Sequence, residues 1–146
     1  MEAIVLAGGK AERLGDAAGG KPKALVPVGG RPLVSYQVQR LAEAGVGRVI
    51  VSCAAGREEE FVDALAGLGA EIVPVGEPEP LGRGGGLRFA TAARREQGDV
   101  FALNGDELVD VEFTELLARH GRTGAAATIT LVPLPSSFGV VDLDED

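Results

Sequence analysis

The chain has 146 residues, enough for one domain with a sizeable core, and 45% of them are apolar although only 4% are aromatic. The formal net charge is −8, yet the first 50 positions hold seven Lys and Arg against four Asp and Glu. A basic amino-terminal third in an acidic chain suits a small anionic ligand and excludes the broad basic face of a nucleic-acid-binding protein. One cysteine, no apolar run of membrane length and no signal-peptide pattern predict a cytoplasmic protein that contacts no membrane.

Strand-like and helix-like segments alternate along the sequence. An apolar run predicts a first strand at residues 3–6, and Pro32 begins a helix that Gly45 ends. Further along we expect strand 48–53, helix 57–68, strand 70–75, a loop rich in Gly and Pro at 76–82, helix 87–95, strand 99–103, helix 112–120 and strand 125–132. This alternation predicts an α/β fold with a three-layer, Rossmann-like and mostly parallel sheet.

A loop of small residues follows the first strand directly. Residues 6–9 leave backbone N–H groups free to face an anion, and Arg13 and Lys23 add fixed positive charge. The pattern predicts a polyphosphate site, with a flexible glycine turn as the alternative. Two better-known phosphate motifs are excluded, because residues 15–22 have Pro22 where a P-loop needs Ser or Thr, and no G-x-G-x-x-G dinucleotide motif follows the strand.

Two further segments follow strand-like runs, and ligands in parallel α/β sheets bind beyond the carboxyl ends of the strands. Asn104-Gly105-Asp106 comes after one such run, where the Asp106 carboxylate would be a ligand for Mg²⁺ beside phosphate oxygens. A plain turn of these residue types is the alternative. Residues 77–86 begin with prolines and end with glycines, which lets a flat ligand lie against the main chain, and a glycine hinge is the alternative.

In this order the segments resemble the nucleotidyltransferases that activate sugar 1-phosphates. Members of that family read roughly L-A-G-G-x-G-x-R-L, P-K-x-L-x-P-V-x-G-x-P, E-P-L-G-T-x-G and N-G-D, and the counterparts here are residues 6–14, 22–32, 79–85 and 104–106. The resemblance covers nearly the whole chain. It implies a nucleotidyltransferase core with a Rossmann-like sheet, and Mg²⁺ as the cofactor.

Roles for single residues follow from this resemblance. Lys23 would contact the reacting phosphates, Arg13 the leaving pyrophosphate and Asp106 the Mg²⁺ ion. Gly139, which belongs to a Phe-Gly-Val-Val segment, would lie beside the sugar. The residues implied to bind the nucleotide are Leu6, Ala7, Gly8, Gly9, Glu77, Gly82 and Gly105.

Two residues depart from the family pattern, since Ala11 replaces the glycine that follows the Gly-Gly pair of the first motif and Arg83 replaces a threonine. The family's Glu-Lys-Pro sugar-binding segment and second metal-binding aspartate are not found in residues 1–146. We therefore expect a nucleotidyltransferase core without its C-terminal sugar-binding portion. Two alternatives stay open: a molybdopterin-type guanylyltransferase, against which residues 81–86 and 104–106 argue, and a nucleotide-binding regulatory relative without turnover.

The implied reaction is attack of a sugar 1-phosphate oxygen on the α-phosphorus of a nucleoside triphosphate, in line with the departing pyrophosphate. Those two molecules are the expected partners, and the oligomeric state, a homo-oligomer included, stays open. Glu77 stands where family members that use uracil or thymine commonly have glutamine. A carboxylate accepts the two adjacent donors of guanine, N1–H and the 2-amino group, so we predict a preference for GTP over UTP and dTTP.

Overall fold

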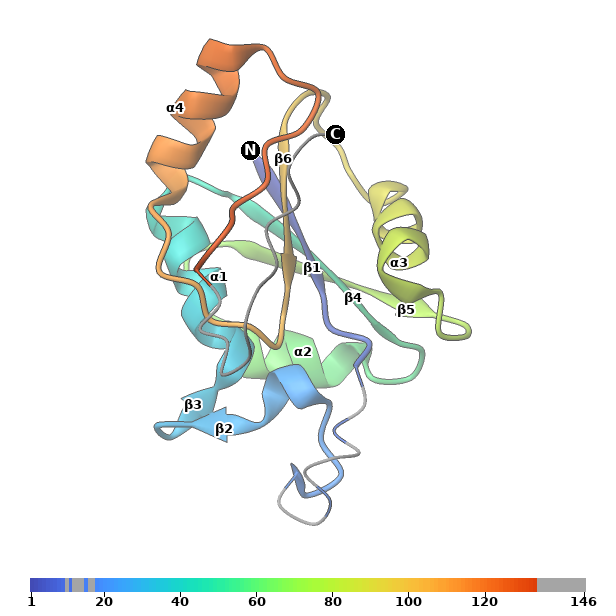
Figure 1. Ribbon diagram of the computed structural model, residues 1–146. Helices are drawn as coiled ribbons and strands as arrows, with labels where there is room; N and C mark the ends of the chain where they lie inside the picture. Colours follow the sequence, from blue (N-terminus) through green and yellow to red (C-terminus); the bar gives the residue numbers. More distant parts are fainter. Residues whose placement is uncertain (10, 12–14, 16–17, 134–146) are drawn as a thin grey trace, which may run out of the picture. The chain divides into compact units, whose positions relative to one another are not determined.

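The computed structural model describes residues 1–9, 11, 15 and 18–133. The chain divides into two compact units, Met1–Phe113 and Thr114–Asp146. The first unit holds a sheet in which every neighbouring pair of strands is parallel (Figure 1). Across this sheet the order is β5 (Glu71–Glu77), β4 (Arg48–Ala54), β1 (Glu2–Leu6) and β6 (Val100–Asn104). Within the described ranges, no helix is long and apolar enough to cross a membrane.

Helices cover both faces of the sheet, because alternate side chains along each strand point to opposite sides. The helices of the first unit are α1 (Leu33–Glu43), α2 (Glu58–Leu65) and α3 (Gly82–Thr91). On one face, Val5 and Val51 belong to a core cluster that α1 and α2 complete. On the other face, Ile4 and Ile50 pack with residues of α3. These three layers confirm the α/β, Rossmann-like fold predicted from the sequence.

Helix α3 begins at Gly82, earlier than the predicted start at residue 87. Glycine disfavours a helix by about 1 kcal/mol relative to alanine, which is why the glycine run predicted a loop. Packing overrides that preference here, because a Cβ atom built on Gly86 would lie 2.8 Å from Oε1 of Glu77. The close approach of that carboxylate to the helix backbone requires a residue without a side chain.

Short elements between β1 and α1 were not predicted. A 3₁₀ turn, η2 (Lys23–Leu25), precedes a hairpin of two short antiparallel strands, β2 (Pro27–Val28) and β3 (Arg31–Pro32). Helix α1 therefore begins at Leu33, and Pro32 is its N-cap residue rather than its first residue. Strands of two residues are too short for an alternating pattern to indicate them.

Helix α4 (Phe113–Thr123) confirms the helix expected at residues 112–120. The strand expected at residues 125–132 is wrong, since residues 124–133 contain no strand. The β-branched residues of this segment favour an extended chain, but a strand also needs a backbone partner, and none pairs with it among the described residues. As a result Ile129 and Leu131 are 79% and 85% exposed.

At the amino ends of the strands, Glu2 is fully buried. Its carboxylate accepts hydrogen bonds from the backbone N–H groups of Arg95 at 3.0 Å and Glu96 at 3.2 Å. It also contacts the guanidinium groups of Arg48 and Arg94, at 3.4 and 3.3 Å. Burial raises the pKa of Glu2, but these hydrogen bonds outweigh it and hold the pKa below its usual value. The network fastens the chain that follows α3 to the sheet.

Candidate active site

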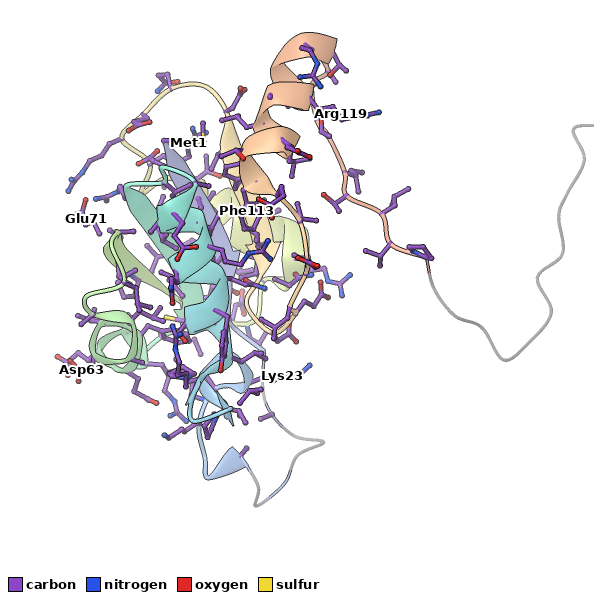
Figure 2. The ribbon with its side chains drawn as sticks, turned by 90° about the vertical axis from the view of Figure 1, so that its left-hand side faces the viewer. Met1, Lys23, Asp63, Glu71, Phe113 and Arg119 are labelled. Carbon is purple, nitrogen blue, oxygen red and sulfur yellow. The ribbon has the colours of Figure 1, made fainter. Side chains whose placement is uncertain are left out.

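The carboxyl ends of β1 and β6 meet where the strand order reverses. From β1 the chain moves outward to β4 and β5, and then returns to β6 on the other side of β1. Leu6, Ser52 and Asn104 therefore lie in one row at this end of the sheet. Such a switch point is the usual ligand site of a parallel α/β sheet. Figure 2 shows Lys23 at this end of the molecule, away from Met1.

Lys23 and Asp106, both predicted to serve the site, contact each other at the switch point. Nζ of Lys23 donates to Oδ2 of Asp106 at 2.7 Å, although 83 positions separate them in the chain. The two side chains are 43% and 32% exposed, so both remain accessible to a ligand. The backbone N–H of Lys23 also donates to the carbonyl of Gly9, which holds the lysine beside the loop after β1.

Gly105 brings the Asp106 segment directly against the loop after β1. Its N–H donates to the carbonyl of Leu6 at 2.7 Å. A Cβ atom at this position would lie 3.1 Å from that same carbonyl oxygen and 3.3 Å from Cβ of Ala24. A side chain would push Asp106 away from the loop, so the glycine serves a close approach of two backbones.

Glu77, at the end of β5, lies between two parts of the site. Its Oε1 accepts a hydrogen bond from the Ser52 hydroxyl at 2.6 Å, and its Oε2 accepts one from the backbone N–H of Leu81 at 3.1 Å. A Cβ atom on Gly8 would lie 3.6 Å from Oε1, so the carboxylate also faces the loop after β1. Open space surrounds the Cβ position of Gly82, the first residue of α3, which leaves room for a ligand there.

The described residues bring together Leu6, Ala7, Gly8, Gly9, Lys23, Gly105 and Asp106 at the switch point, with Glu77 beside Gly8. Arg13 and Gly139 lie outside the described residues, so the expected pyrophosphate and sugar contacts stay predictions. Sequence reasoning missed Ser52, which is fully buried and would have read as a plain strand residue. Its only signal was a hydroxyl in an otherwise apolar run.

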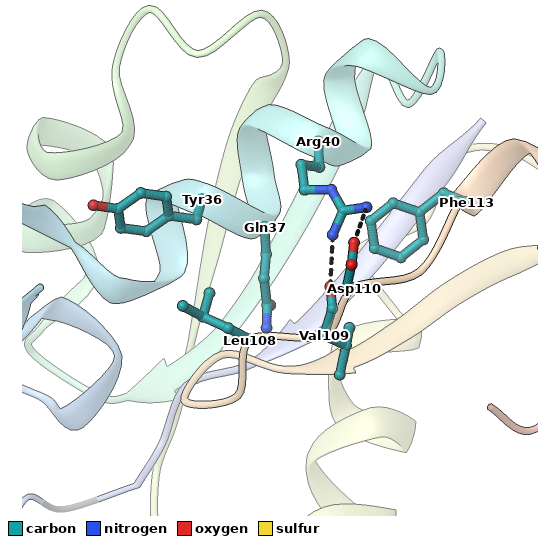
Figure 3. A pocket seen from close by; sticks show the side chains of 7 residues that line it. All are labelled: Tyr36, Gln37, Arg40, Leu108, Val109, Asp110 and Phe113. Atoms are coloured by element: carbon teal, nitrogen blue, oxygen red, sulfur yellow. Dashed lines mark hydrogen bonds and ion pairs between the residues drawn. The ribbon is translucent and has the colours of Figure 1, made fainter. Parts of the chain in front are cut away.

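Arg40 of α1 holds the segment that follows Asp106. Its two terminal nitrogens donate to the carbonyls of Val109 at 2.6 Å and Val111 at 2.7 Å, and its guanidinium lies 3.7 Å from Asp110. These contacts border a pocket of about 310 Å³ (Figure 3). The lining residues are Tyr36, Gln37, Arg40, Leu108, Val109, Asp110 and Phe113. An arginine on a helix face gave no sequence signal for this anchoring role.

Asp106 is the residue that would hold a divalent cation. In the part of the chain that the structure describes, no three His, Cys, Asp or Glu residues gather into a group that could hold a metal ion. A Mg²⁺ ion would therefore need phosphate oxygens and water beside the Asp106 carboxylate, which is the ligand set that Mg²⁺ prefers. That carboxylate is accessible and already contacts a cationic group, so the residues fit such an ion.

Comparison with known proteins identifies the family of the chain. Residues 3–133 match the family model described as MobA-like NTP transferase domain. A mannose-1-phosphate guanylyltransferase of Mycobacterium tuberculosis is 38% identical over 152 positions, which cover 100% of this chain and 42% of that protein. A mannose-1-phosphate guanyltransferase of Debaryomyces hansenii is 36% identical and is covered to the same extent. The chain thus spans less than half the length of these curated relatives.

Solved structures agree with this comparison. HddC from Yersinia pseudotuberculosis, complexed with GMP-PN, superposes with a TM-score of 0.69 at 25% identity, over 82% of this chain and 53% of that one. The inositol-1-phosphate CTP transferase from T. maritima superposes with a TM-score of 0.64 at 31% identity, over 72% of this chain and 43% of that one. Both matches cover more than two thirds of this chain.

Proposed function

Because this chain belongs to the family of MobA-like NTP transferase domains, we propose that its site transfers a nucleotidyl group from a nucleoside triphosphate to a sugar 1-phosphate. The products are an NDP-sugar and pyrophosphate. The observation that carries the proposal is the contact of Lys23 with Asp106 beside the loop after β1, at the switch point of the sheet. Residues 1–146 serve as the nucleotidyltransferase core of this activity.

In this reaction the residues work by position and charge. The attacking sugar phosphate is already ionised, so no general base has to remove a proton. The backbone N–H groups of Gly8 and Gly9 bind the nucleotide, whereas the N–H of Ala7 donates to the carbonyl of Ser52. The Lys23 ammonium neutralises charge on the phosphates as the new bond forms. Arg13 is proposed to bind the leaving pyrophosphate. Gly139 is proposed to lie beside the sugar.

Mg²⁺ is the proposed cofactor, and Asp106 is the residue proposed to hold it. When bound, the ion neutralises phosphate charge and orients the triphosphate. The partly exposed Asp106 carboxylate at the end of β6 supports this assignment, because one or two carboxylates together with phosphate oxygens suffice for Mg²⁺.

Guanine is the proposed base, and a GDP-mannose-type or GDP-heptose-type sugar nucleotide is the proposed product. The Glu77 carboxylate supports this choice, since each of its oxygens accepts one hydrogen bond from the protein and can accept a second one. Two mannose-1-phosphate guanylyltransferases among the relatives agree with it. The carbonyl oxygens of uracil or thymine would instead be repelled by a carboxylate.

A pyrophosphate-release assay on the complete gene product that contains this chain tests the reaction. We expect release from GTP and Mg²⁺ only when mannose 1-phosphate or another sugar 1-phosphate is added. Tight nucleotide binding without release would support the regulatory relative instead. Release that depends on a molybdopterin acceptor would support the molybdopterin-type guanylyltransferase.

Thermal-shift measurements with GTP, UTP and dTTP, each with Mg²⁺, test the base. We expect GTP to stabilise the protein most, and Glu77→Gln to narrow that advantage, because an amide presents a donor where the carboxylate presents only acceptors. Stronger stabilisation of the unchanged protein by UTP or dTTP would refute the guanine assignment.

A further inference from the structure

Ser52 joins two parts of the nucleotide site through two different groups. Its backbone carbonyl accepts a hydrogen bond from the N–H of Ala7 at 2.7 Å, in the loop after β1. Its hydroxyl donates to Oε1 of Glu77 at 2.6 Å. The side chain is fully buried, so water does not compete for that hydroxyl.

The second oxygen of Glu77 is held as well. Oε2 accepts a hydrogen bond from the backbone N–H of Leu81, the residue before α3. With one protein donor on each oxygen, the plane of the carboxylate is fixed. Gly8 and Gly86 lie near the same group, since a Cβ atom built on them would be 3.6 and 2.8 Å from Oε1.

A carboxylate fixed in this way presents one unused acceptor position on each oxygen. Guanine carries two adjacent donors, N1–H and the 2-amino group, and a flat pair of acceptors matches them only when its orientation is set. If the Ser52 hydroxyl were lost, Oε1 would lose its protein donor. The carboxylate could then turn about its remaining hydrogen bond to Leu81.

We infer that Ser52 is a positioning residue that determines base specificity, because its hydroxyl orients Glu77 toward the 2-amino edge of guanine. This inference rests on the proposed guanylyl transfer. The Ser52 side chain touches no substrate and acts through Glu77 alone. Its effect is therefore specific to ligands that offer the 2-amino donor.

The test compares GTP with inosine triphosphate (ITP), which is GTP without the 2-amino group. Titration calorimetry with Mg²⁺ measures both dissociation constants for the unchanged protein, for Ser52→Ala and for the control Ser35→Ala. Ser35 is also buried, and its hydroxyl has no hydrogen-bond partner among the described residues. We expect Ser52→Ala to reduce the preference for GTP over ITP about tenfold, the effect of losing one well-oriented hydrogen bond. Ser35→Ala should leave the preference unchanged.

An unchanged ratio of the GTP and ITP dissociation constants in Ser52→Ala would overturn the inference, whether binding of both ligands is weakened equally or not at all. A purely structural role of Ser52 predicts that result. Failure of the proposed function has a separate signature, in which the unchanged protein binds UTP more tightly than GTP. If Ser52→Ala does not fold, the same two dissociation constants are measured for Ser52→Cys. Cysteine fills nearly the same volume but is a weak donor, so the preference for GTP should still fall.

Discussion

Lys23 and Asp106 form an ion pair of 2.7 Å at the end of the sheet where β1 and β6 lie side by side. Substrate binding would exchange this pair for two others, ammonium with phosphate and carboxylate with Mg²⁺. An ion pair that is about one-third to two-fifths exposed contributes only about 0–1 kcal/mol to folding. The exchange therefore costs little, and either residue can be replaced without unfolding the protein.

Replacing Lys23 tests the role of its charge. Lys23→Ala in the complete enzyme should lower kcat by about 10²–10³, the usual cost of losing one preorganised charge at a reacting phosphate. Stopped-flow or steady-state pyrophosphate release measures the effect, and thermal unfolding checks the fold. Lys21→Ala is the matched control, since Lys21 is an exposed lysine only two positions away. Near-normal turnover of Lys23→Ala would remove this residue from the mechanism.

Replacing Asp106 tests the metal site. Asp106→Asn should weaken Mg²⁺-dependent binding of GTP and leave the thermal midpoint of the protein alone nearly unchanged, because the lost ion pair is partly exposed. Calorimetric titration with and without Mg²⁺ separates these effects. Asp110→Asn removes a fully exposed carboxylate from the same segment and should change neither quantity. If the Mg²⁺ dependence of Asp106→Asn equals that of the unchanged protein, residues 104–106 form a plain turn.

Two glycines of α3 make a matched pair. Gly84→Ala should raise the free energy of unfolding by about 0.5–1 kcal/mol, because alanine favours a helix and nothing lies within 4 Å of the new Cβ atom. Gly86→Ala should lack this gain and weaken GTP binding, because its Cβ atom would displace the Glu77 carboxylate. Urea unfolding and GTP titration measure the two effects. Equal stabilisation by both variants, with GTP affinity kept, would contradict the close contact at Gly86.

The buried carboxylate of Glu2 predicts a pH dependence of stability. Its pKa is lowered in the folded protein, so the unfolded chain binds more protons in acid. The contribution of Glu2 to the free energy of unfolding is therefore present above its ordinary pKa of 4.5. It is lost as the pH falls through the lower pKa of the folded protein. Glu2→Gln should cost about 3 kcal/mol near neutral pH, because it removes the buried carboxylate that pairs with the guanidinium groups of Arg48 and Arg94.

Urea unfolding at a series of pH values measures this effect. The difference in unfolding free energy between Glu2→Gln and the unchanged protein should shrink in acid. Glu96→Gln is the control, since Glu96 pairs with the amino terminus at the surface and its side chain is 57% exposed. A difference that stays constant from pH 7 down to strong acid would show that the charge of Glu2 does not stabilise the fold.

The sequence predicted those elements whose signal lies in one continuous segment. The apolar runs of β1, β4 and β6 predicted strands, and their alternation with helices predicted the parallel sheet. The early start of α3 and the missing strand at residues 125–132 were not predictable, because both depend on contacts that local composition does not contain. A run of glycines predicts a loop, and the contact with a carboxylate from another strand that favours a helix here cannot be read from the run itself.

The residues of the candidate site, too, could be predicted from the sequence only in part. Motif spacing predicted Lys23 and Asp106, which the structure brings into contact from positions far apart in the chain. The same spacing cannot indicate Ser52 or Arg40, because both act through hydrogen-bond partners that only the fold places nearby. Glu77 was predicted as a nucleotide ligand from its position in a motif. Its hydrogen bonds to Ser52 and to Leu81 came only with the structure.

The Glu2 network and the Lys23–Asp106 pair lie at opposite ends of the same strands. Mutations that change which nucleotides are accepted would fall on the loops at the carboxyl ends of the strands. The stability that lets the fold tolerate such mutations would come from the Glu2 network at the amino ends. A directed-evolution library could therefore diversify the exposed positions Glu79, Arg83 and Gly84, and would leave Gly86 and the buried charges around Glu2 unchanged.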